Sequence, residues 1–299
     1  MTTGRLHPDQ HPVDEDLVRR LVAGRFPRWA ELPVRRFPSG GTVNAMFRLG
    51  EDMVVRLPLV AGGASDVALE REWLPRLAPL LPTDVPEVLA AGEPAAGFPW
   101  PWSVYRWLAG RNPEAGALAE PLQLAQDLAE FVRAMRGVGL PGAPRAYRGG
   151  PLVELDAETR AAIEELRGVP EEGVDCDAVA AVWEDALRAP GWDGDPVWLH
   201  ADLMPGNLLV EGGRLTAVID FGCMGVGDPA CDLFPAWNLL PADARAVFRE
   251  ALGVDEAMWR RGRGRTLSQA VIALPYYRKT NRAMADNARF VIREVLGDG

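Results

Sequence analysis

One segment, residues 197–222, limits the folds open to this chain more than any other part of the sequence. It begins VWLHADLMPGNLLV and places His200, Asp202 and Asn207 in the spacing H-x-D-x-x-x-x-N. Asp220 follows thirteen positions after Asn207, in the sequence AVIDFG. Apolar residues around the polar ones, and a glycine pair between them, predict a strand, a loop and a tight hairpin. This hairpin would bring Asn207 and Asp220 to one end of a small sheet, and we expect His200 to be a packing and hydrogen-bonding pivot.

The polar residues of the segment suit one kind of chemistry when they are taken together. A carboxylate such as Asp202 can orient a hydroxyl and accept its proton, and Asn207 and Asp220 supply the hard oxygen ligands that Mg²⁺ prefers. Each motif is weak alone. The combination is specific because both occur in order and are followed by a G-D-P-x-x-D sequence that contains Asp228 and Asp232.

The sequences HADLMPGN, IDFG and GVGDPACDL resemble the catalytic region of the aminoglycoside-phosphotransferase family, whose members are relatives of the protein kinases. The resemblance implies transfer of the γ-phosphoryl group of ATP or GTP to a hydroxyl of a small molecule, with Mg²⁺ as cofactor. It implies Asp202 as the catalytic base and Asn207 and Asp220 as magnesium ligands. Asp228 and Asp232 are expected to support the loop rather than to react.

The spacing of apolar residues divides the chain into two parts. Residues 34–60 predict antiparallel strands between helices at 13–24 and 66–80, and a further buried strand is expected at 102–108. The remainder is mostly helical, with helices expected at 117–136, 156–167, 177–188, 241–252 and 265–296. We therefore expect an α+β fold, which the resemblance makes bilobal and protein-kinase-like. The expected domains are a nucleotide-binding lobe at 1–107 and a helical lobe with the catalytic loop and substrate pocket at 108–299.

The resemblance calls for a phosphate-covering loop and a cation in the first lobe. The glycine-rich connection between the first two strands supplies the loop, with candidate contacts at Ser39, Gly40, Gly41, Thr42 and Asn44. Arg56 stands on the third strand where the resemblance has lysine, and Lys279 is the only lysine in the chain. Because arginine stays charged and can fork onto phosphate oxygens, we expect Arg56 to be the cation. A plain glycine hairpin and a surface arginine are the alternatives.

The same resemblance calls for an acid that orients the cation. Glu70 and Glu72 both qualify and face different sides of the predicted helix. Glu70 is preferred because it lies on the apolar side. The nucleotide base is expected to meet backbone groups from Arg106 to Leu108, where the lobes join. Candidate substrate contacts are Asp228, Asp232, the acid-rich stretch 154–172 and the region of Tyr276 and Tyr277, with solvated helix faces as the alternative for most of the glutamates.

Composition excludes several classes of partner. The formal net charge of -10 argues against nucleic acid or an anionic membrane surface and is compatible with a cationic substrate. Acidity that serves only to keep the protein soluble is the alternative. No apolar run is long enough to span a membrane, and the polar start of the chain lacks a secretory signal. The three cysteines show no metal-binding spacing and are typical of a reducing compartment, so we expect the cytoplasm. The oligomeric state does not follow from the sequence.

Three functions agree with these observations. The first is a kinase for an antibiotic, an aminoglycoside or, as the second choice, a macrolide. The second is a metabolic kinase of the same fold that acts on choline, an amino alcohol, a sugar or another small alcohol. The third is a non-catalytic pseudokinase, which Arg56 in place of lysine would favour. A serine or cysteine hydrolase is disfavoured because the only histidines are His7, His11 and His200.

Overall fold

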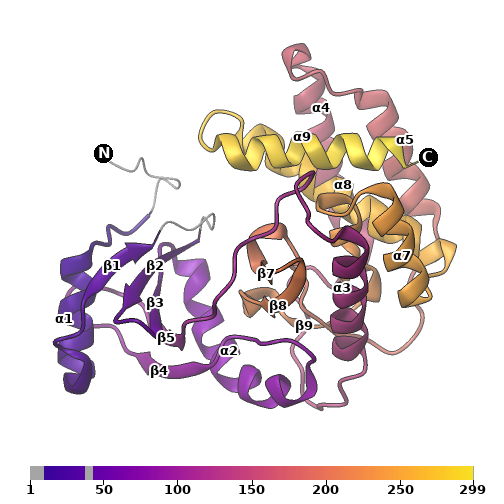
Figure 1. Cartoon of the computed structure of the whole chain (residues 1–299). Coiled ribbons are helices and arrows are strands. Elements are labelled where there is room, and N and C mark those ends of the chain that lie inside the picture. Colours follow the sequence, from indigo (N-terminus) through magenta and orange to yellow (C-terminus); the bar gives the residue numbers. More distant parts are fainter. Residues whose placement is uncertain (1–9, 38–42, 299) are drawn as a thin grey trace. The chain divides into compact units, whose positions relative to one another are not determined.

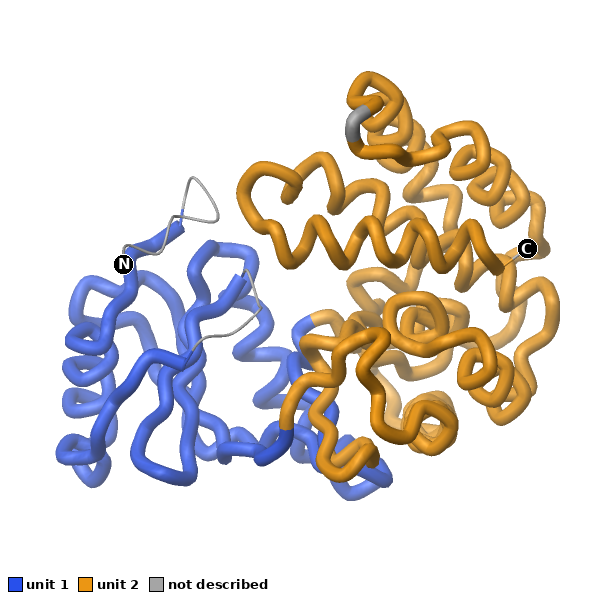
Figure 2. The backbone as a smooth tube through the Cα atoms, turned by 45° about the horizontal axis from the view of Figure 1, so that its top comes forward, with its two compact units in different colours: residues 1–110, 217–222 blue, residues 111–216, 223–299 orange. Residues whose placement is uncertain are grey.

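The computed structural model describes residues 10–37 and 43–298 of the chain, which divides into two compact units (Figure 2). Unit 1 contains the described residues up to Gly110 together with the short segment Ala217–Gly222. Unit 2 contains Arg111–Thr216 and the described residues from Cys223 onward. Asp220 is therefore part of unit 1 although it lies in the second half of the sequence. None of the helices in the described ranges has the length and apolar character needed to cross a membrane.

A five-stranded antiparallel sheet forms the centre of unit 1 (Figure 1). Its strands are β1 (Val34–Phe37), β2 (Asn44–Leu49), β3 (Met53–Pro58), β4 (Val88–Gly92) and β5 (Trp102–Arg106), in the spatial order β1-β2-β3-β5-β4. Gly50, in the turn between β2 and β3, has a φ of 62°, a left-handed conformation that suits glycine. The strands predicted within residues 34–60 and 102–108 are present.

The two faces of this sheet carry different side chains, because residues along a strand alternate between faces. On one face, Phe47 and Val55 belong to a buried apolar core that also includes residues of α1 (Glu15–Arg25). On the other face, the buried side chain of Arg56 lies against α2 (Ala64–Leu77). The second helix is therefore tied to the sheet by a buried ion pair as well as by apolar contacts.

Unit 2 is mostly helical. Its helices are α3 (Pro121–Arg136), α4 (Asp156–Arg167), α5 (Cys176–Arg188), α6 (Pro235–Asn238), α7 (Ala242–Leu252), α8 (Glu256–Tyr277) and α9 (Arg282–Gly297). Four of the predicted helices correspond to α3, α4, α5 and α7, with small differences at their ends. A β-rich unit 1 and a helical unit 2 confirm the predicted fold class.

The prediction of a single helix at 265–296 is wrong. The structure has two helices, α8 and α9, and α8 begins earlier, at Glu256. Asn281 separates them because its side chain accepts a hydrogen bond from the N–H of Met284 at 3.2 Å and so caps the start of α9.

Two glycines explain why the first half of α8 escaped prediction. Glycine has a low helix propensity, so Gly262 and Gly264 argue against a helix at these positions. In the structure both are close-packing positions. A Cβ atom at Gly262 would lie 2.7 Å from the side chain of Leu233, and one at Gly264 would lie 2.2 Å from that of Ala186. The glycines are therefore required by the packing of α8 against its neighbours.

Two small two-stranded sheets lie within and next to the segment that carries the motif. They pair β6 (Val197–Leu199) with β9 (Gly225–Gly227), and β7 (Leu208–Glu211) with β8 (Arg214–Val218). The turn between β7 and β8 uses Gly212 and Gly213, both with positive φ. The predicted strand, loop and hairpin are present, whereas the pairing of β6 with β9 was not predicted.

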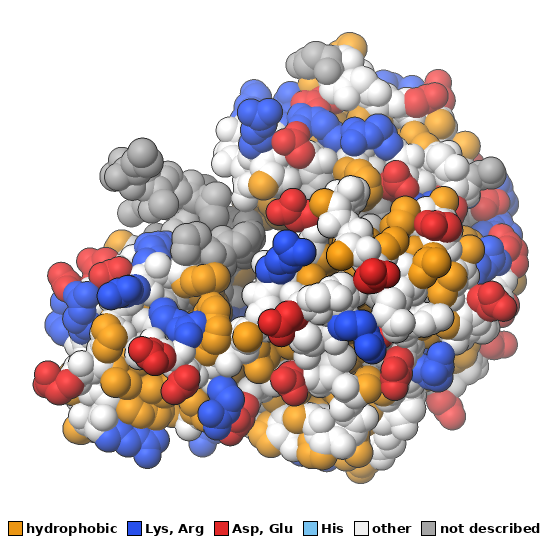
Figure 3. All heavy atoms as spheres, viewed as in Figure 1, with side chains coloured by type: hydrophobic (Ala, Val, Ile, Leu, Met, Phe, Trp, Pro, Cys, Tyr) orange, Lys and Arg blue, Asp and Glu red, His pale blue; other side chains and the backbone are white. Residues whose placement is uncertain are grey.

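Acidic and basic side chains are interspersed on the face of the molecule in Figure 3. No large patch of one sign stands out on this face.

Candidate active site

A buried aspartate fixes the loop that follows β6. The carboxylate of Asp232 accepts hydrogen bonds from the backbone N–H groups of His200 at 2.9 Å and Ala201 at 2.7 Å. Ala201 has a φ of 64°, which is uncommon for a residue with a side chain. Burial raises the pKa of Asp232, while the hydrogen bonds and the nearby positive charge oppose that rise. Asp232 thus contacts the loop directly, as expected for a residue that supports the loop.

His200 lies inside the protein at the start of this loop. Its side chain is fully buried, and its Nδ1 accepts a hydrogen bond from the N–H of Asp202 at 3.2 Å. Its ring packs edge-on against that of Phe131, with centroids 6.4 Å apart. His200 therefore has the packing and hydrogen-bonding role that was expected for it.

Asp202 and Asn207 are joined by two hydrogen bonds within unit 2. Asn207 Nδ2 donates to the backbone oxygen of Asp202 at 2.8 Å and to its Oδ2 at 3.0 Å. The side chain of Asp202 is 20% exposed, so its carboxylate is fixed and still reaches solvent. A carboxylate held in this way can meet a substrate hydroxyl.

Arg148 also belongs to this group, although no pattern in the sequence pointed to it. Its Nη1 lies 3.0 Å from Asp202 Oδ1, and the same nitrogen donates to Cys223 Sγ at 3.0 Å. Burial works against the charge of Arg148, but Asp202 outweighs it and raises the pKa of the guanidinium. We call Asp202, Asn207, Arg148, His200 and Asp232 the Asp202 cluster.

The backbone around Arg148 is anchored to the segment after the I-D-F-G motif. The N–H of Ala146 donates to the oxygen of Val226 at 3.0 Å, and the oxygen of Arg148 accepts from Arg265 Nη1 at 2.5 Å. No local pattern marks this loop, because its place depends on residues far away in the sequence.

A second group of polar side chains surrounds Arg56 in unit 1. Arg56 Nη1 donates to both oxygens of Glu70, at 2.8 and 2.9 Å, and Nη2 donates to Asp220 Oδ1 at 2.8 Å. Asp66 lies 3.6 Å from Nη2. Asn44 satisfies its neighbours only with Oδ1 toward Arg56, where it accepts from Nη2 at 2.8 Å and from Nε at 3.0 Å. We call these five residues the Arg56 cluster.

The backbone at Asp220 is tied into the same cluster. Asp220 has a φ of 63°, and the N–H of the next residue, Phe221, donates to Glu70 Oε1 at 2.9 Å. A Cβ atom at Gly222 would lie 2.7 Å from the Asp66 carboxylate, so this close approach requires glycine. The D-F-G sequence is thus fitted closely around two acids of α2.

Burial controls the ionisation of the Arg56 cluster. Burial opposes the charge of Arg56, but Asp220 and Glu70 outweigh it and raise the pKa of the guanidinium well above its usual value. Burial raises the pKa of Asp66 to about 7, and Arg56 limits the rise. Burial and then the charge of Glu70 raise the pKa of Tyr105, whose hydroxyl donates to that carboxylate. The cluster therefore keeps one cation among several acids.

Of the two glutamates considered as partners of Arg56, the structure pairs Glu70 with it. Glu70 is fully buried, whereas Glu72 is exposed on the other side of α2. The predicted loop contacts Ser39, Gly40, Gly41 and Thr42 lie outside the described residues, while Asn44 begins β2.

The backbone at the end of β5 is partly engaged. The N–H of Arg106 donates to the oxygen of Glu87 at 3.0 Å, and the N–H of Trp107 donates to that of Asp52 at 2.7 Å. Within the described ranges, the N–H of Leu108 makes no hydrogen bond. Among the described residues, Leu108 is thus the one of the three whose N–H has no protein partner.

Most of the acids predicted near the substrate already have partners. Asp228 is buried and receives two hydrogen bonds from Arg261, at 2.8 and 3.2 Å. Glu172 in the stretch 154–172 pairs with Arg289 at 2.7 Å. Tyr276 is 54% exposed and packs edge-on against Tyr277. Asp228 is thus structural, and Tyr276 is the more accessible candidate.

The donor atoms present fit magnesium. Among the described residues, no donor reaches Asn207 Oδ1 or Asp220 Oδ2, so each predicted ligand keeps a free hard oxygen. No group of three His, Cys, Asp or Glu side chains in those residues is arranged to hold a metal. Mg²⁺ commonly binds to only one or two protein groups together with nucleotide phosphates and water.

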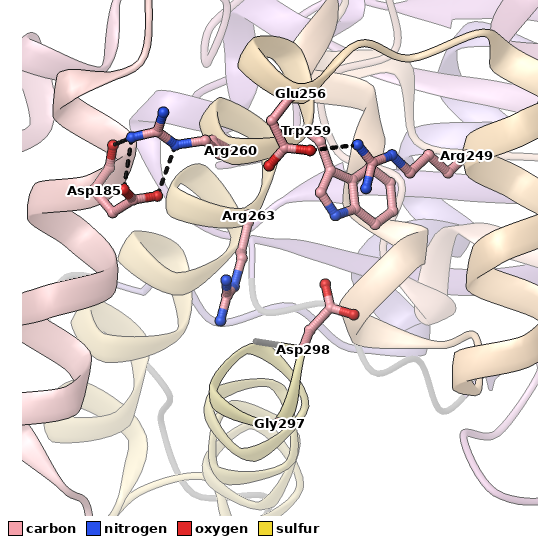
Figure 4. Close-up of a pocket in the computed structure, with 8 residues that line it drawn as sticks. All are labelled: Asp185, Arg249, Glu256, Trp259, Arg260, Arg263, Gly297 and Asp298. Carbon is pink, nitrogen blue, oxygen red and sulfur yellow. Dashed lines mark hydrogen bonds and ion pairs between the residues drawn. The ribbon is translucent and has the colours of Figure 1, made fainter.

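A cavity of about 400 Å³ lies elsewhere in unit 2 (Figure 4). None of the residues that line it was predicted to be catalytic, nucleotide-binding or metal-binding. Most charged groups on its wall are already paired. Arg260 binds Asp185 at 2.6 Å, and Arg249 binds Glu256 at 2.6 Å. These ion pairs stabilise the contacts of α8 with α5 and α7.

Several solved structures of low sequence identity are similar to this chain. The GDP and kanamycin complex of APH(2'')-IIIa is 19% identical, with a TM-score of 0.77, and the match covers 94% of this chain and 99% of that one. The macrolide 2'-phosphotransferase MphH from Brachybacterium faecium is 22% identical, with a TM-score of 0.61 and coverage of 94% and 98%. ADP-bound APH(2'')-Ib is 16% identical, with a TM-score of 0.61 and coverage of 94% and 98%. These likenesses show the kinase-like fold.

A search of the curated proteins found no match. The phosphotransferase enzyme family, APH, matches residues 34–265. This range contains both the Asp202 cluster and the Arg56 cluster, and it covers well over half of the chain. The resemblance inferred from the motifs is thereby confirmed, and the chain belongs to the APH phosphotransferase family.

Proposed function

We propose that this protein transfers the γ-phosphoryl group of ATP or GTP to a hydroxyl of a small molecule in the cytoplasm, with an aminoglycoside-type antibiotic as the favoured acceptor. The observation that carries the proposal is the state of Asp202. Its carboxylate is held on one side by Asn207 and on the other by Arg148, and it remains partly exposed. An aspartate with a purely structural role would not need a carboxylate that reaches solvent.

In the proposed reaction, Asp202 orients the acceptor hydroxyl and accepts its proton. The acceptor oxygen forms a bond to the γ-phosphorus as the bond from that phosphorus to the β-phosphate oxygen breaks, and ADP or GDP leaves. Asn207 Oδ1 and Asp220 Oδ2 are the proposed magnesium ligands. When bound, Mg²⁺ would offset the negative charge of the phosphates.

The proposed nucleotide site is formed by Ser39, Gly40, Gly41, Thr42, Asn44, Arg56, Glu70, Arg106 and Leu108. Backbone N–H groups of the glycine-rich stretch are suited to phosphate oxygens. The free N–H of Leu108 is suited to an acceptor atom of the base. Complexes of related structures with GDP and with ADP support a nucleotide donor for this chain without selecting between ATP and GTP.

A pseudokinase is the second candidate, and one observation favours it. All three nitrogens of Arg56 already have protein partners, so the residue offers less to a phosphate than a lysine would. The free oxygens of Asn207 and Asp220 favour the enzyme instead. A metabolic kinase for choline, an amino alcohol or a sugar differs from the first proposal only in its acceptor.

The first test is a thermal-shift titration with ATP and with GTP, each with and without Mg²⁺. A ligand that binds only the folded state at 100 times its Kd adds about 2.7 kcal/mol of stability. We expect a magnesium-dependent rise in Tm that Asp220→Ala abolishes. No rise with either nucleotide would favour the pseudokinase.

The acceptor is then sought by release of ADP or GDP in the presence of candidate alcohols. The panel contains kanamycin and gentamicin, a macrolide, choline, an amino alcohol and simple sugars. Related structures with kanamycin and gentamicin, and of macrolide phosphotransferases, support the first members of this panel. Release that depends on kanamycin and disappears in Asp202→Asn would support the favoured acceptor, and release with choline alone would select the metabolic kinase.

A further inference from the structure

The nitrogens of Arg56 point to three different protein groups. Nε faces Asn44 on β2, Nη1 faces Glu70 on α2, and Nη2 faces both Asn44 and Asp220. The arginine is only 6% exposed. It is therefore a buried junction between the sheet, a helix and the segment that carries the predicted metal ligand.

The junction restrains Asp220 from two directions. Arg56 Nη2 holds Oδ1 of its carboxylate at 2.8 Å, and Glu70, itself bound to Arg56, accepts the N–H of Phe221 at 2.9 Å. These contacts fix both the side chain and the backbone of a residue whose φ of 63° is otherwise uncommon. Among the described residues, no donor reaches Asp220 Oδ2.

A phosphate oxygen could bind Arg56 only in competition with these contacts. The guanidinium is surrounded by three carboxylates, those of Asp66, Glu70 and Asp220, so its charge is already more than balanced. Releasing Glu70 would leave a fully buried carboxylate without its cation, which is costly. The contacts of Arg56 therefore favour a role through its neighbours over direct phosphate binding.

We propose that Arg56 is a positioning residue, which orients Asp220 for magnesium and makes no direct contact with the nucleotide phosphates. The inference rests on the proposed nucleotide site and assigns a role within it. Arginine suits this role where lysine would not, because its planar fork can bind separate acceptors at fixed angles. Asn44 completes the fork by accepting from the two nitrogens that face β2.

The two roles predict different effects on nucleotide binding. Residues that orient metal ligands typically change metal affinity by about 10- to 100-fold when they are replaced. If Arg56 acts through Asp220, Arg56→Gln should weaken binding of the magnesium–nucleotide complex and leave binding in EDTA unchanged. If Arg56 binds phosphate directly, the variant should weaken both to a similar degree.

The experiment is calorimetric titration of the full chain with ADP and GDP, in Mg²⁺ and in EDTA. The quantity compared is the ratio of Kd in EDTA to Kd in Mg²⁺. We expect Arg56→Gln to lower this ratio by about 10-fold or more, and Asp220→Asn to do the same. The double variant should lose no more than either single one, since both act on the same metal site. The matched control is Arg35→Gln, which removes an exposed arginine from the same sheet.

Equal losses in Mg²⁺ and in EDTA for Arg56→Gln would overturn the inference while leaving the proposed function in place. Failure of the wild-type chain to bind either nucleotide would overturn both. Should Arg56→Gln not fold, Asn44→Ala answers the question, because it keeps the buried pair of Arg56 and Glu70. A lower ratio for Asn44→Ala supports the positioning role, and an unchanged ratio contradicts it.

Discussion

Asp202 keeps its carboxylate in place through neighbours on both sides, so its chemistry can be tested with little change in shape. Asp202→Asn retains the size of the side chain and removes the proton acceptor. We expect kcat to fall by about 100- to 10,000-fold, the range for loss of a general base. Nucleotide affinity should stay close to that of the wild type, as calorimetry would show. Turnover at the wild-type rate would remove Asp202 from the reaction.

Arg148 should affect the same step through Asp202. Arg148→Gln removes the contact at 3.0 Å and allows the carboxylate to turn. A small displacement of a catalytic group can lower the rate by about 100-fold, so we expect a loss of that order in kcat with little change in KM for the nucleotide. Arg148→Lys should recover part of the loss.

The control for this prediction is Arg145→Gln. Arg145 belongs to the same loop, but it pairs with the exposed Glu154 and does not contact Asp202. A change in nucleotide KM without a change in kcat for Arg148→Gln would assign Arg148 to nucleotide binding instead.

The candidate residues of the motif were selected from the sequence, whereas their partners in the structure were not. Spacing alone selected Asp202, Asn207 and Asp220, because local sequence determines which of them share a loop or hairpin. Arg148 donates to the oxygen of Ala201 from 53 positions away, and no short-range pattern records such a contact. The roles of Asn44 and Asp66 around Arg56 depend in the same way on the pairing of strands and the packing of α2.

At the scale of elements, Asp127 on α3 anchors the hairpin of β7 and β8. Its Oδ2 accepts from Arg214 Nε at 2.9 Å and from the N–H of Leu215 at 3.0 Å. Burial opposes ionisation, but these hydrogen bonds together outweigh it and hold the pKa of Asp127 below its ordinary value. The stabilisation is therefore present above the ordinary carboxyl pKa and is lost as the pH falls through the lowered value.

The lowered pKa of Asp127 gives a prediction for the stability of Asp127→Asn. At neutral pH we expect the variant to lose about 1 to 3 kcal/mol of unfolding free energy, the range for hydrogen bonds to a charged group. Denaturation in urea from pH 7 down to pH 3 should show this loss shrinking at the acidic end. A loss that is constant with pH would mean that the charge of Asp127 does not contribute.

The elements themselves were predictable where periodicity was clean and unpredictable where packing overrode propensity. The strands of unit 1 and helices α3, α4, α5 and α7 follow their apolar spacing. The first half of α8 does not, because Gly262 and Gly264 are kept for close contact with Leu233 and Ala186. The polar side chain of Asn281 ends one helix and begins the next, a boundary that apolar spacing does not mark.

At the scale of the whole molecule, composition predicted the sign of the net charge, which acts at long range, and little about the location of the site. Acidic residues exceed basic ones, 42 to 32, and charges of both signs are mixed on the face in Figure 3. Where charges alternate, their fields cancel at short range, while the net charge still acts at a distance. The sequence could therefore suggest the sign of an acceptor but could not locate its pocket.

The net charge leads to a prediction about salt. A polycationic aminoglycoside approaching a chain of charge -10 should be attracted at low ionic strength. The Debye length falls from about 10 Å at 0.1 M salt to about 3 Å at 1 M, which screens this attraction. With nucleotide and Mg²⁺ saturating, kcat/KM for kanamycin should therefore fall steeply as KCl is raised, and kcat should change little. A neutral sugar that is also phosphorylated provides the control, because its kcat/KM should hardly depend on salt. Equal salt dependence for the cationic and the neutral acceptor would show that the net charge does not guide substrate to this protein.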